Sequence, residues 1–283
     1  MIGPGYTVIP GGKGANQAVA AAGSGVPVGM AGCVGVDTFG ELLLASLAGA
    51  GVDAGLVRWV GVPTGCAAIG VDRTGTNLIM VAGGANYEAR ADGVPDAALT
   101  PATMLVLQME TAPAENWALV RRAHARGAKV LLNVAPAAPV PADVLDLIDL
   151  LVVNEGEALA VARHVGIAAT HPVDAARSLA GTTGGTCVVT LGGDGAVAWS
   201  GDGSGWRIGA LPITPVDTTA AGDAFVGWLA ARLAAGDGLP TALRWATVAS
   251  GIACLTAGAQ PSLPAFDAVA ARMGEAPQPD PAA

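Results

Sequence analysis

The sequence predicts a three-layer α/β sandwich, and three observations support this prediction. Short apolar runs alternate with Ala- and Leu-rich stretches of helical length, which is typical of successive βα units. The 283-residue chain is 52% hydrophobic and 13% charged, so it has enough apolar material for one large core. Its 41 glycines and 19 prolines interrupt the apolar runs and indicate turns. Parallel strands joined by helices need cover on both faces, which gives a mainly parallel sheet between two helical layers.

The individual elements follow from this alternation. The short apolar runs predict strands at 28–33, 66–71, 78–81, 104–109, 130–133, 150–154 and 187–191. The Ala- and Leu-rich stretches predict helices at 15–22, 39–47, 115–126, 155–164, 173–179, 222–235, 239–256 and 265–273. In such a fold, a ligand is expected beyond the carboxyl ends of the strands.

Two segments depart from the alternation. Residues 65–84 predict two strands around a turn at 72–75, and this hairpin is either a flap over a site or an ordinary edge hairpin. Residues 200–213 predict short strands and turns. We find no repeat and no linker, so residues 1–283 are expected to form one domain, with a flexible tail at 274–283.

Composition excludes several classes of function. The net charge of -9 excludes a nucleic-acid binder that relies on bulk electrostatics, because Lys and Arg must neutralise the phosphates. No apolar stretch has the length of a membrane span and no leader is evident, so a soluble, cytoplasmic protein without a membrane partner is expected. The four cysteines lack CxxC spacing and are expected to be buried free thiols, and the three histidines lack HxxxH spacing. A zinc site and a Ser-His-Asp hydrolase are therefore not expected.

The most informative motif is the small-residue loop at 216–225, which leads into an Ala-rich helix. The free amides of a helix N-terminus can hold an anion, and small residues let a ligand approach the backbone. Asp223 could be a general base that takes a hydroxyl proton while the amides of Ala220, Ala221, Gly222 and Asp223 hold a phosphoryl group. Alternatively, Asp223 favours the helix dipole and Asp217 caps the turn.

A second glycine loop, 11–17, also enters a helix. It is not a P-loop, because Thr7 stands where the first glycine is needed and Gly14 follows Lys13 in place of Ser or Thr. Spacing alone favours the ordinary interpretation, in which Lys13 is a solvent-exposed lysine at a helix start.

Three weaker signals lie at predicted strand ends. Asn154 and Glu157 follow a strand about one helical turn apart, which suits either oxygen ligands of Mg²⁺ or a capping box. The glycine turn at 190–195 could admit a nucleotide or simply reverse the chain. Glu110 ends another strand and could face the same crevice.

Taken in order, these segments resemble the ribokinase branch of the carbohydrate kinases that share a fold with phosphofructokinase B. The resemblance runs from about 6 to 268 and includes 11–16, similar to the sugar-binding signature, and 217–223, similar to the catalytic signature. Further matches are 35–40, 132–137, 154–157 and 258–262, of which 132–137 and 258–262 favour the ribokinase branch.

The resemblance implies ATP-dependent phosphorylation of the primary hydroxyl of D-ribose. By position, Asp223 would be the base beside the anion hole formed by Ala220, Ala221 and Gly222. The sugar would be held by Gly12, Lys13, Gly14, Ala15, Asn16, Glu110 and Asp223. The ATP site would be lined by Asn154, Thr190, Leu191, Gly192, Gly193, Asp194, Gly195, Gly222, Asp223 and Thr247.

The resemblance also implies two cations and a partner. Asn154 and Glu157 would orient Mg²⁺ through water. A potassium ion would be held by Asp217, Thr219, Ala253, Thr256, Gly258 and Ser262. The family's lid strands match about 1–10 and 65–84 here and would pair with those of a second subunit, giving a homodimer.

One departure from the family concerns the start of the chain. Family members begin with a central strand that carries an Asn-Ala-Asp-like segment, and about thirty such residues are absent before Tyr6. Either the start codon has been placed too late, or the chain is a truncated relative with an unpaired strand edge and a damaged pocket. A neighbouring sugar kinase such as a deoxyribokinase, or a non-catalytic sugar or nucleotide binder, are the alternative functions.

Overall fold

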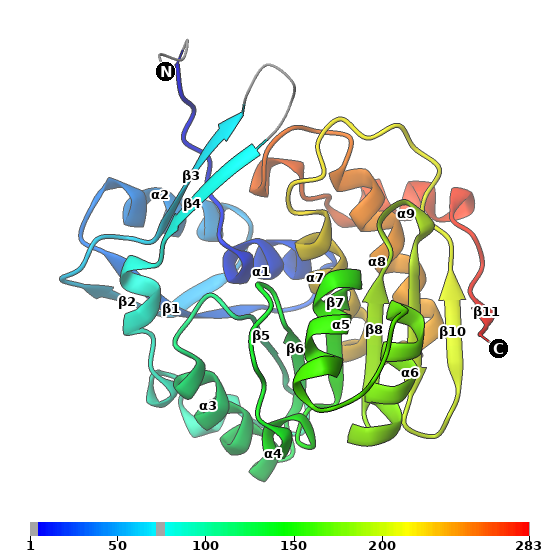
Figure 1. Ribbon diagram of the computed structural model, residues 1–283. Coiled ribbons are helices and arrows are strands. Elements are labelled where there is room, and N and C mark those ends of the chain that lie inside the picture. The colour runs from blue at the N-terminus through cyan, green and yellow to red at the C-terminus, as the bar shows by residue number, and fades with distance from the viewer. Residues whose placement is uncertain (1–4, 72–76, 283) are drawn as a thin grey trace.

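A seven-stranded sheet forms the centre of the computed structural model, which describes residues 5–71 and 77–282 (Figure 1). The strand order is β11-β10-β9-β8-β7-β6-β5. The strands are β5 (Met104–Leu107), β6 (Lys129–Asn133), β7 (Leu150–Asn154), β8 (Thr186–Thr190), β9 (Ala196–Ser200), β10 (Gly205–Ile208) and β11 (Asp280–Pro281). The α/β fold class is confirmed.

The sheet is mixed rather than mainly parallel. Strands β5 to β8 pair in parallel, because helices connect each strand to the next. From β8 onward the pairing is antiparallel, because the turns before β9 and β10 are too short for a crossover. β9 was not among the predicted strands, whereas β10 lies in the segment predicted to contain short strands.

Helices cover both faces of this sheet. One face packs on α3 (Pro113–Ala125), α4 (Ala142–Leu145), α5 (Glu155–His164) and α6 (Pro172–Thr183). The other face packs on α1 (Lys13–Gly23), α7 (Ala221–Ala234), α8 (Leu239–Ala253) and α9 (Phe266–Arg272). Within β6, Leu132 belongs to the first core and Leu131 to the second, and both are fully buried. This alternation is what a strand covered on two faces requires.

Two strands form a separate parallel sheet. β1 (Gly29–Gly35) pairs with β2 (Asp53–Val60), and α2 (Thr38–Gly49) connects them. The buried core beneath them is small: Ala18, Leu47 and Val52. In the described part of the chain β1 pairs only with β2 and β5 only with β6, so each of these two strands has one unpaired edge.

A hairpin of β3 (Cys66–Val71) and β4 (Asn77–Ala82) extends away from the body (Figure 1). Four large apolar side chains of the hairpin are exposed: Ile69 at 53%, and Leu78, Met80 and Val81 at more than 60% each. Cys66 is also exposed, contrary to the expectation of four buried thiols, because this hairpin lies outside the cores. The predicted turn at 72–75 lies outside the described residues.

The first lid strand, predicted at about 1–10, is not present in residues 5–10. These residues form no strand, and no backbone hydrogen bond links them to β3 or β4 among the described residues. Tyr6 is 92% exposed, so the segment lacks the packing that would hold it as a strand.

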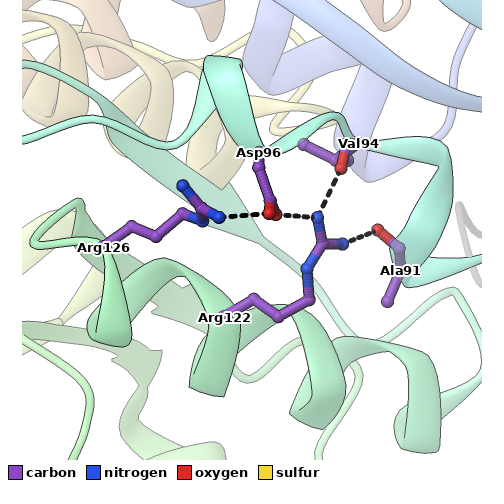
Figure 2. A network of polar contacts seen from close by, with 5 residues as sticks. All are labelled: Ala91, Val94, Asp96, Arg122 and Arg126. Carbon is purple, nitrogen blue, oxygen red and sulfur yellow. Dashed lines mark hydrogen bonds and ion pairs between the residues drawn. The ribbon is translucent and has the colours of Figure 1, made fainter.

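The connection from β4 to β5 contains three short helices, η1 (Gly84–Glu88), η2 (Ala91–Gly93) and η3 (Asp96–Ala98). Figure 2 shows how α3 holds this connection: Arg122 donates to the carbonyl oxygens of Ala91 and Val94 and to Asp96. Arg126 contacts the same carboxylate. The segment that leads away from the hairpin is therefore fixed to the body.

The segment predicted as a flexible tail, 274–283, contacts the body over its described residues 274–282. It contains η6 (Met273–Glu275) and β11, and the Ala282 amide donates to the Gly205 carbonyl at 2.9 Å. Arg244 of α8 also donates to the carbonyl oxygens of Met273 and Ala276. The edge of β10 that β11 covers and the Arg244 guanidinium supply partners that composition alone does not reveal.

Within residues 5–71 and 77–282, every helix is too short or too polar to span a bilayer.

Candidate active site

The loop before α7 exposes the start of that helix. Ala220 precedes the helix with φ of 60°, the one positive φ at a non-glycine position among the described residues. The first N–H groups of a helix have no intrahelical acceptor, so they can hold an anion. A side chain built at Gly222 would meet nothing within 4 Å, so there is open space in front of this helix start.

Asp223 lies in the first turn of α7 and is 6% exposed. One carboxylate oxygen, Oδ2, accepts from Asn16 Nδ2 at 2.8 Å, and the other, Oδ1, accepts from Gln17 Nε2 at 3.1 Å. Both donors come from α1, which packs directly on α7. The structure thus brings the two glycine-loop motifs together around one buried carboxylate.

The environment of Asp223 suits a group that exchanges a proton. Burial raises the pKa of Asp223, while the positive charge of Lys13 and the amides of Asn16 and Gln17 oppose that rise. A carboxylate with a raised pKa is a better proton acceptor than one in water.

The N-terminus of α1 carries the expected sugar-binding residues. Gly12 precedes the helix with φ of 91°, a conformation that glycine adopts without strain. The amide of Lys13 donates to Glu110 Oε2 at 2.9 Å, which places Glu110 beside this loop. Asn16 is buried and its Oδ1 has no partner in the described part of the chain.

Three amide side chains near Asp223 were not predicted as site residues. Gln17, Asn133 at the end of β6, and Gln108 just after β5 form a hydrogen-bonded chain that ends at the Asp223 carboxylate. Asn133 stands in the matched motif 132–137 and Gln17 directly follows the matched motif 11–16, but the contact between them joins positions 116 residues apart, so spacing along the chain could not reveal it.

Asn154 and Glu157 form a complete capping box at the start of α5. Asn154 Oδ1 accepts from the Glu157 amide at 2.9 Å, and Glu157 Oε2 accepts from the Asn154 amide at 2.8 Å. Burial raises the pKa of Glu157, and the Lys13 charge opposes this, so Glu157 lies within electrostatic reach of the sugar-binding loop. No donor among the described residues reaches Glu157 Oε1, which leaves that oxygen suited to a water-mediated ion.

The glycine turn after β8 borders the same edge of the sheet, because Thr190 is paired with Asn154. The turn closes with a hydrogen bond of 2.8 Å from the Leu191 amide to the Gly195 carbonyl, around η4 (Gly192–Asp194). A side chain at Gly192 or Gly193 would meet nothing, so the outer side of the turn is open. Thr247 lies buried in α8, and its hydroxyl has no partner in the described residues.

Asp217 joins the loop before α7 to the loop after α8. Its Oδ1 accepts from the Thr219 amide and hydroxyl, and its Oδ2 accepts from the Gly258 amide at 2.8 Å. These donors lower the pKa of Asp217, so the carboxylate stays ionised. Of the six predicted potassium ligands, the structure links Asp217, Thr219 and Gly258 directly. Ala253 ends α8, Thr256 lies in the loop after it, and Ser262 ends η5 (Gln260–Ser262).

No group of three or more His, Cys, Asp and Glu side chains suited to a metal occurs within the described ranges. The predicted cation positions therefore rely on amide, hydroxyl and main-chain oxygens in addition to one carboxylate each. Such oxygen donors fit Mg²⁺ with retained waters, or a monovalent ion.

Comparison with known proteins agrees with this geometry. A family model described as pfkB family carbohydrate kinase matches residues 2–265. A ribokinase of Schizosaccharomyces pombe is 35% identical over 272 residues, covering 93% of this chain and 86% of the relative. A ribokinase of Haemophilus influenzae is 34% identical, covering 93% and 87%.

Solved structures give the same result. The crystal structure of a ribokinase from Thermotoga maritima superposes with a TM-score of 0.87 at 31% identity, covering 95% of this chain and 89% of that one. A structure of Arabidopsis thaliana ribokinase complexed with ribose and ATP gives a TM-score of 0.84 at 29% identity, covering 93% and 87%. The resemblance predicted from the motifs is confirmed, and the chain belongs to the pfkB family of carbohydrate kinases.

Proposed function

We propose that this carbohydrate kinase transfers the terminal phosphoryl group of ATP to O5 of D-ribose, giving ribose 5-phosphate and ADP. The observation that carries the proposal is the buried Asp223 carboxylate in the first turn of α7, bonded on both oxygens by amides of the glycine-loop helix α1. The identities of 31–35% to curated ribokinases support ribose as the sugar.

In the proposed mechanism, Asp223 accepts the proton of the attacking hydroxyl. The first amides of α7, from Ala221 to Asp223, hold the negative charge that develops on the transferred group, with Ala220 shaping the turn. The loop at Gly12 to Asn16 and Glu110 hold the other sugar hydroxyls, and the buried, unpaired Asn16 Oδ1 is one acceptor suited to such a hydroxyl. The Lys13 charge, which acts on Asp223, would also attract the transferred phosphoryl group.

The nucleotide is proposed to lie along the carboxyl ends of β7 and β8. The pairing of Asn154 with Thr190 and the open outer side of the turn at Gly192 and Gly193 support this position. Gly222 leaves room for the phosphates at the start of α7. Thr247, buried in the neighbouring helix α8, is proposed to line the same site. Leu191, Asp194 and Gly195 complete the turn.

Two cation sites accompany the proposal. Asn154 and Glu157 would hold Mg²⁺ through water, and the ion would neutralise charge on the phosphates. Asp217, with carbonyl and hydroxyl oxygens of the loop at 253–262, would hold potassium beside the start of α7. The ionised Asp217, fixed between both loops, supports this assignment.

The β3–β4 hairpin is proposed as a lid that also joins two subunits. The exposed Ile69, Leu78, Met80 and Val81 give it apolar surface of the kind found at protein interfaces. Sedimentation of the purified chain should give the mass of a dimer, and the mass of a monomer would contradict this assignment.

The decisive experiment compares ADP release with D-ribose, 2-deoxyribose, fructose and adenosine, using Mg-ATP and potassium. Ribose is expected to be the preferred acceptor. Preference for 2-deoxyribose would favour a deoxyribokinase. Ribose-dependent thermal stabilisation without turnover would favour a non-catalytic binder.

The role of Asp223 is tested with Asp223→Asn, which removes the proton acceptor and leaves the side chain nearly the same size. We expect turnover to fall at least a thousandfold while ATP binding, measured by calorimetry, stays within a few fold. Activity above about a tenth of wild type would contradict the assignment of Asp223 as the base.

A further inference from the structure

A chain of side-chain amides runs from the body of the sheet to Asp223. Asn133 Nδ2 donates to the main-chain oxygen of Val152 at 3.0 Å, and Asn133 Oδ1 accepts from Gln17 Nε2 at 3.0 Å. The same Gln17 nitrogen donates to Asp223 Oδ1 at 3.1 Å, and Gln17 Oε1 accepts from Gln108 Nε2 at 2.9 Å. Gln17 is 2% exposed and Asn133 7%, so water does not readily replace these partners.

The direction of this chain is fixed at one end. A main-chain carbonyl oxygen can only accept, so Asn133 must turn its nitrogen toward Val152 and its oxygen toward Gln17. Gln17 must then present its nitrogen to Asn133 and to Asp223. A reversed Gln17 would place its oxygen against two acceptors, the Asn133 oxygen and the Asp223 carboxylate.

We propose that Gln17 and Asn133 are positioning residues that hold Asp223 in the orientation and ionisation state needed to accept a proton, with the Val152 carbonyl setting the direction of the hydrogen bonds. This inference rests on the proposed role of Asp223 as the base. Gln17 occupies Oδ1 and Asn16 occupies Oδ2, so the carboxylate is held at both oxygens.

Gln108 has a different position in the chain. Gln108 Nε2 donates to Gln17 Oε1, whereas the bonds that lead to Asn133 and Asp223 start from Gln17 Nε2. Gln108 is also only partly buried. Removing it leaves the bonds from Val152 through Asn133 to Gln17 in place. The structure therefore predicts unequal effects for three similar amides: a strong effect for Gln17, an intermediate one for Asn133 and a weak one for Gln108.

The charged surroundings of Asp223 stay constant in the test. Among the described groups, Lys13 of α1 is the one whose charge acts on Asp223, and Glu110 and Glu157 lie around that lysine. The variants Gln17→Met, Asn133→Leu and Gln108→Met are neutral and close in size to the original residues. Asn116→Leu is the matched control, because Asn116 is a buried amide that bonds the Gln108 main chain but not Asp223.

The measurement is the pH profile of kcat for ribose phosphorylation. Loss of an amide that stabilises the charged carboxylate raises its pKa, so the acid limb of the profile moves to higher pH. We expect a shift of about one pH unit for Gln17→Met and about half of that for Asn133→Leu. The shift should be much smaller for Gln108→Met and absent for Asn116→Leu. KM for ATP should stay within about threefold in all four variants, and Asn116→Leu should lower Tm.

Each outcome has one meaning. An unmoved acid limb in Gln17→Met, or equal shifts in all four variants, would overturn the proposal. If Gln17→Met fails to fold, as judged by circular dichroism, the contrast between Asn133→Leu and Gln108→Met decides in the same way. If Asp223→Asn itself remains active, the proposed base is wrong. If Asp223→Asn is inactive and the acid limb of Gln17→Met is unmoved, Asp223 remains the proposed base and only the positioning role of Gln17 and Asn133 fails.

Discussion

Individual side chains in this molecule hold together loops that are far apart in the sequence. Asp217 is the clearest case outside the buried centre, because its carboxylate accepts from Thr219 and from Gly258, 41 residues away. Its negative charge is therefore part of what keeps the loop before α7 in register with the loop after α8.

The charge of Asp217 leads to a pH-dependent prediction. Its pKa is lowered in the folded state, so its stabilising contribution is present above the unfolded value of about 3.9 and is lost as the pH falls through the folded value. Asp217→Asn places an NH₂ group against the Gly258 amide, and we expect about 1 kcal/mol lower stability at neutral pH, after allowing for solvent screening.

Thermal unfolding between pH 3 and 8 measures this difference. The gap between wild type and Asp217→Asn should be constant near neutrality and close below about pH 4. Asp146→Asn, at an exposed position after α4, is the control and should show no such gap. A gap that persists unchanged to pH 3 would contradict the ionised role of Asp217.

At this scale the sequence pointed to the carboxylate that we propose as the base, but not to all of the amides that hydrogen-bond around it. Asp223, Asn16 and Glu110 were predicted from motifs, and the structure brings them to one place. Gln17 and Gln108 were not, because their roles depend on contacts between α1, β5 and β6 that no local pattern encodes. Asn154 and Glu157 remained ambiguous in the sequence because a capping box and an ion site use the same side chains, and the structure shows the cap.

Among the elements, α1 and α7 determine whether the two motifs meet. A side chain at Gly227, one helical turn after Asp223, would lie 2.5 Å from the Gln17 carbonyl oxygen and 2.7 Å from the Ala20 Cβ. The two helices therefore approach one another closely because Gly227 has no side chain. This close approach is what lets Asn16 and Gln17 reach Asp223.

Gly227→Ala should consequently separate the helices. We expect a loss of about 1–3 kcal/mol in stability from overpacking and at least a tenfold loss of kcat as the amide contacts to Asp223 lengthen. Gly181→Ala in α6 is the control, because a side chain there meets nothing and alanine favours a helix. That variant should be equally or more stable and fully active. Wild-type activity in Gly227→Ala would show that the spacing of α1 and α7 is not critical.

Most elements were predicted, with bounds that differ by a few residues. α5 and β7 agree with the prediction, since an apolar strand runs directly into an Asn-initiated helix. β2 was missed because its Asp53, Gly55 and Arg58 interrupt the apolar pattern and much of the strand is exposed. β11 was missed because a Pro-rich tail becomes a strand only through the edge of β10 that it meets.

At the scale of the whole molecule, the hydrophobic cores are unequal. The two cores on either side of the large sheet each contain many buried residues, whereas the core beneath β1 and β2 contains Ala18, Leu47 and Val52. Local stability follows buried apolar contacts, so these regions should not open together.

Native-state hydrogen exchange should reveal this difference. We expect amides of β1 and β2 to exchange through openings of lower free energy than amides of β6, β7 and β8, where Val130, Val152 and Val188 respectively are at most 1% exposed. Mass spectrometry of exchanged peptides resolves the two regions. Equal protection in both would mean that β1 and β2 unfold together with the large sheet.

The pairing of β11 with β10 also bears on how the protein behaves at high concentration. Asp280 and Pro281 occupy the outer edge of β10, where an uncovered strand would present free backbone groups to a neighbouring molecule. Proline cannot donate to a further strand, and aspartate disfavours one. Asp280 and Pro281 thus cover a strand edge that would otherwise favour edge-to-edge association, and substitutions that release them from β10 are expected to increase aggregation.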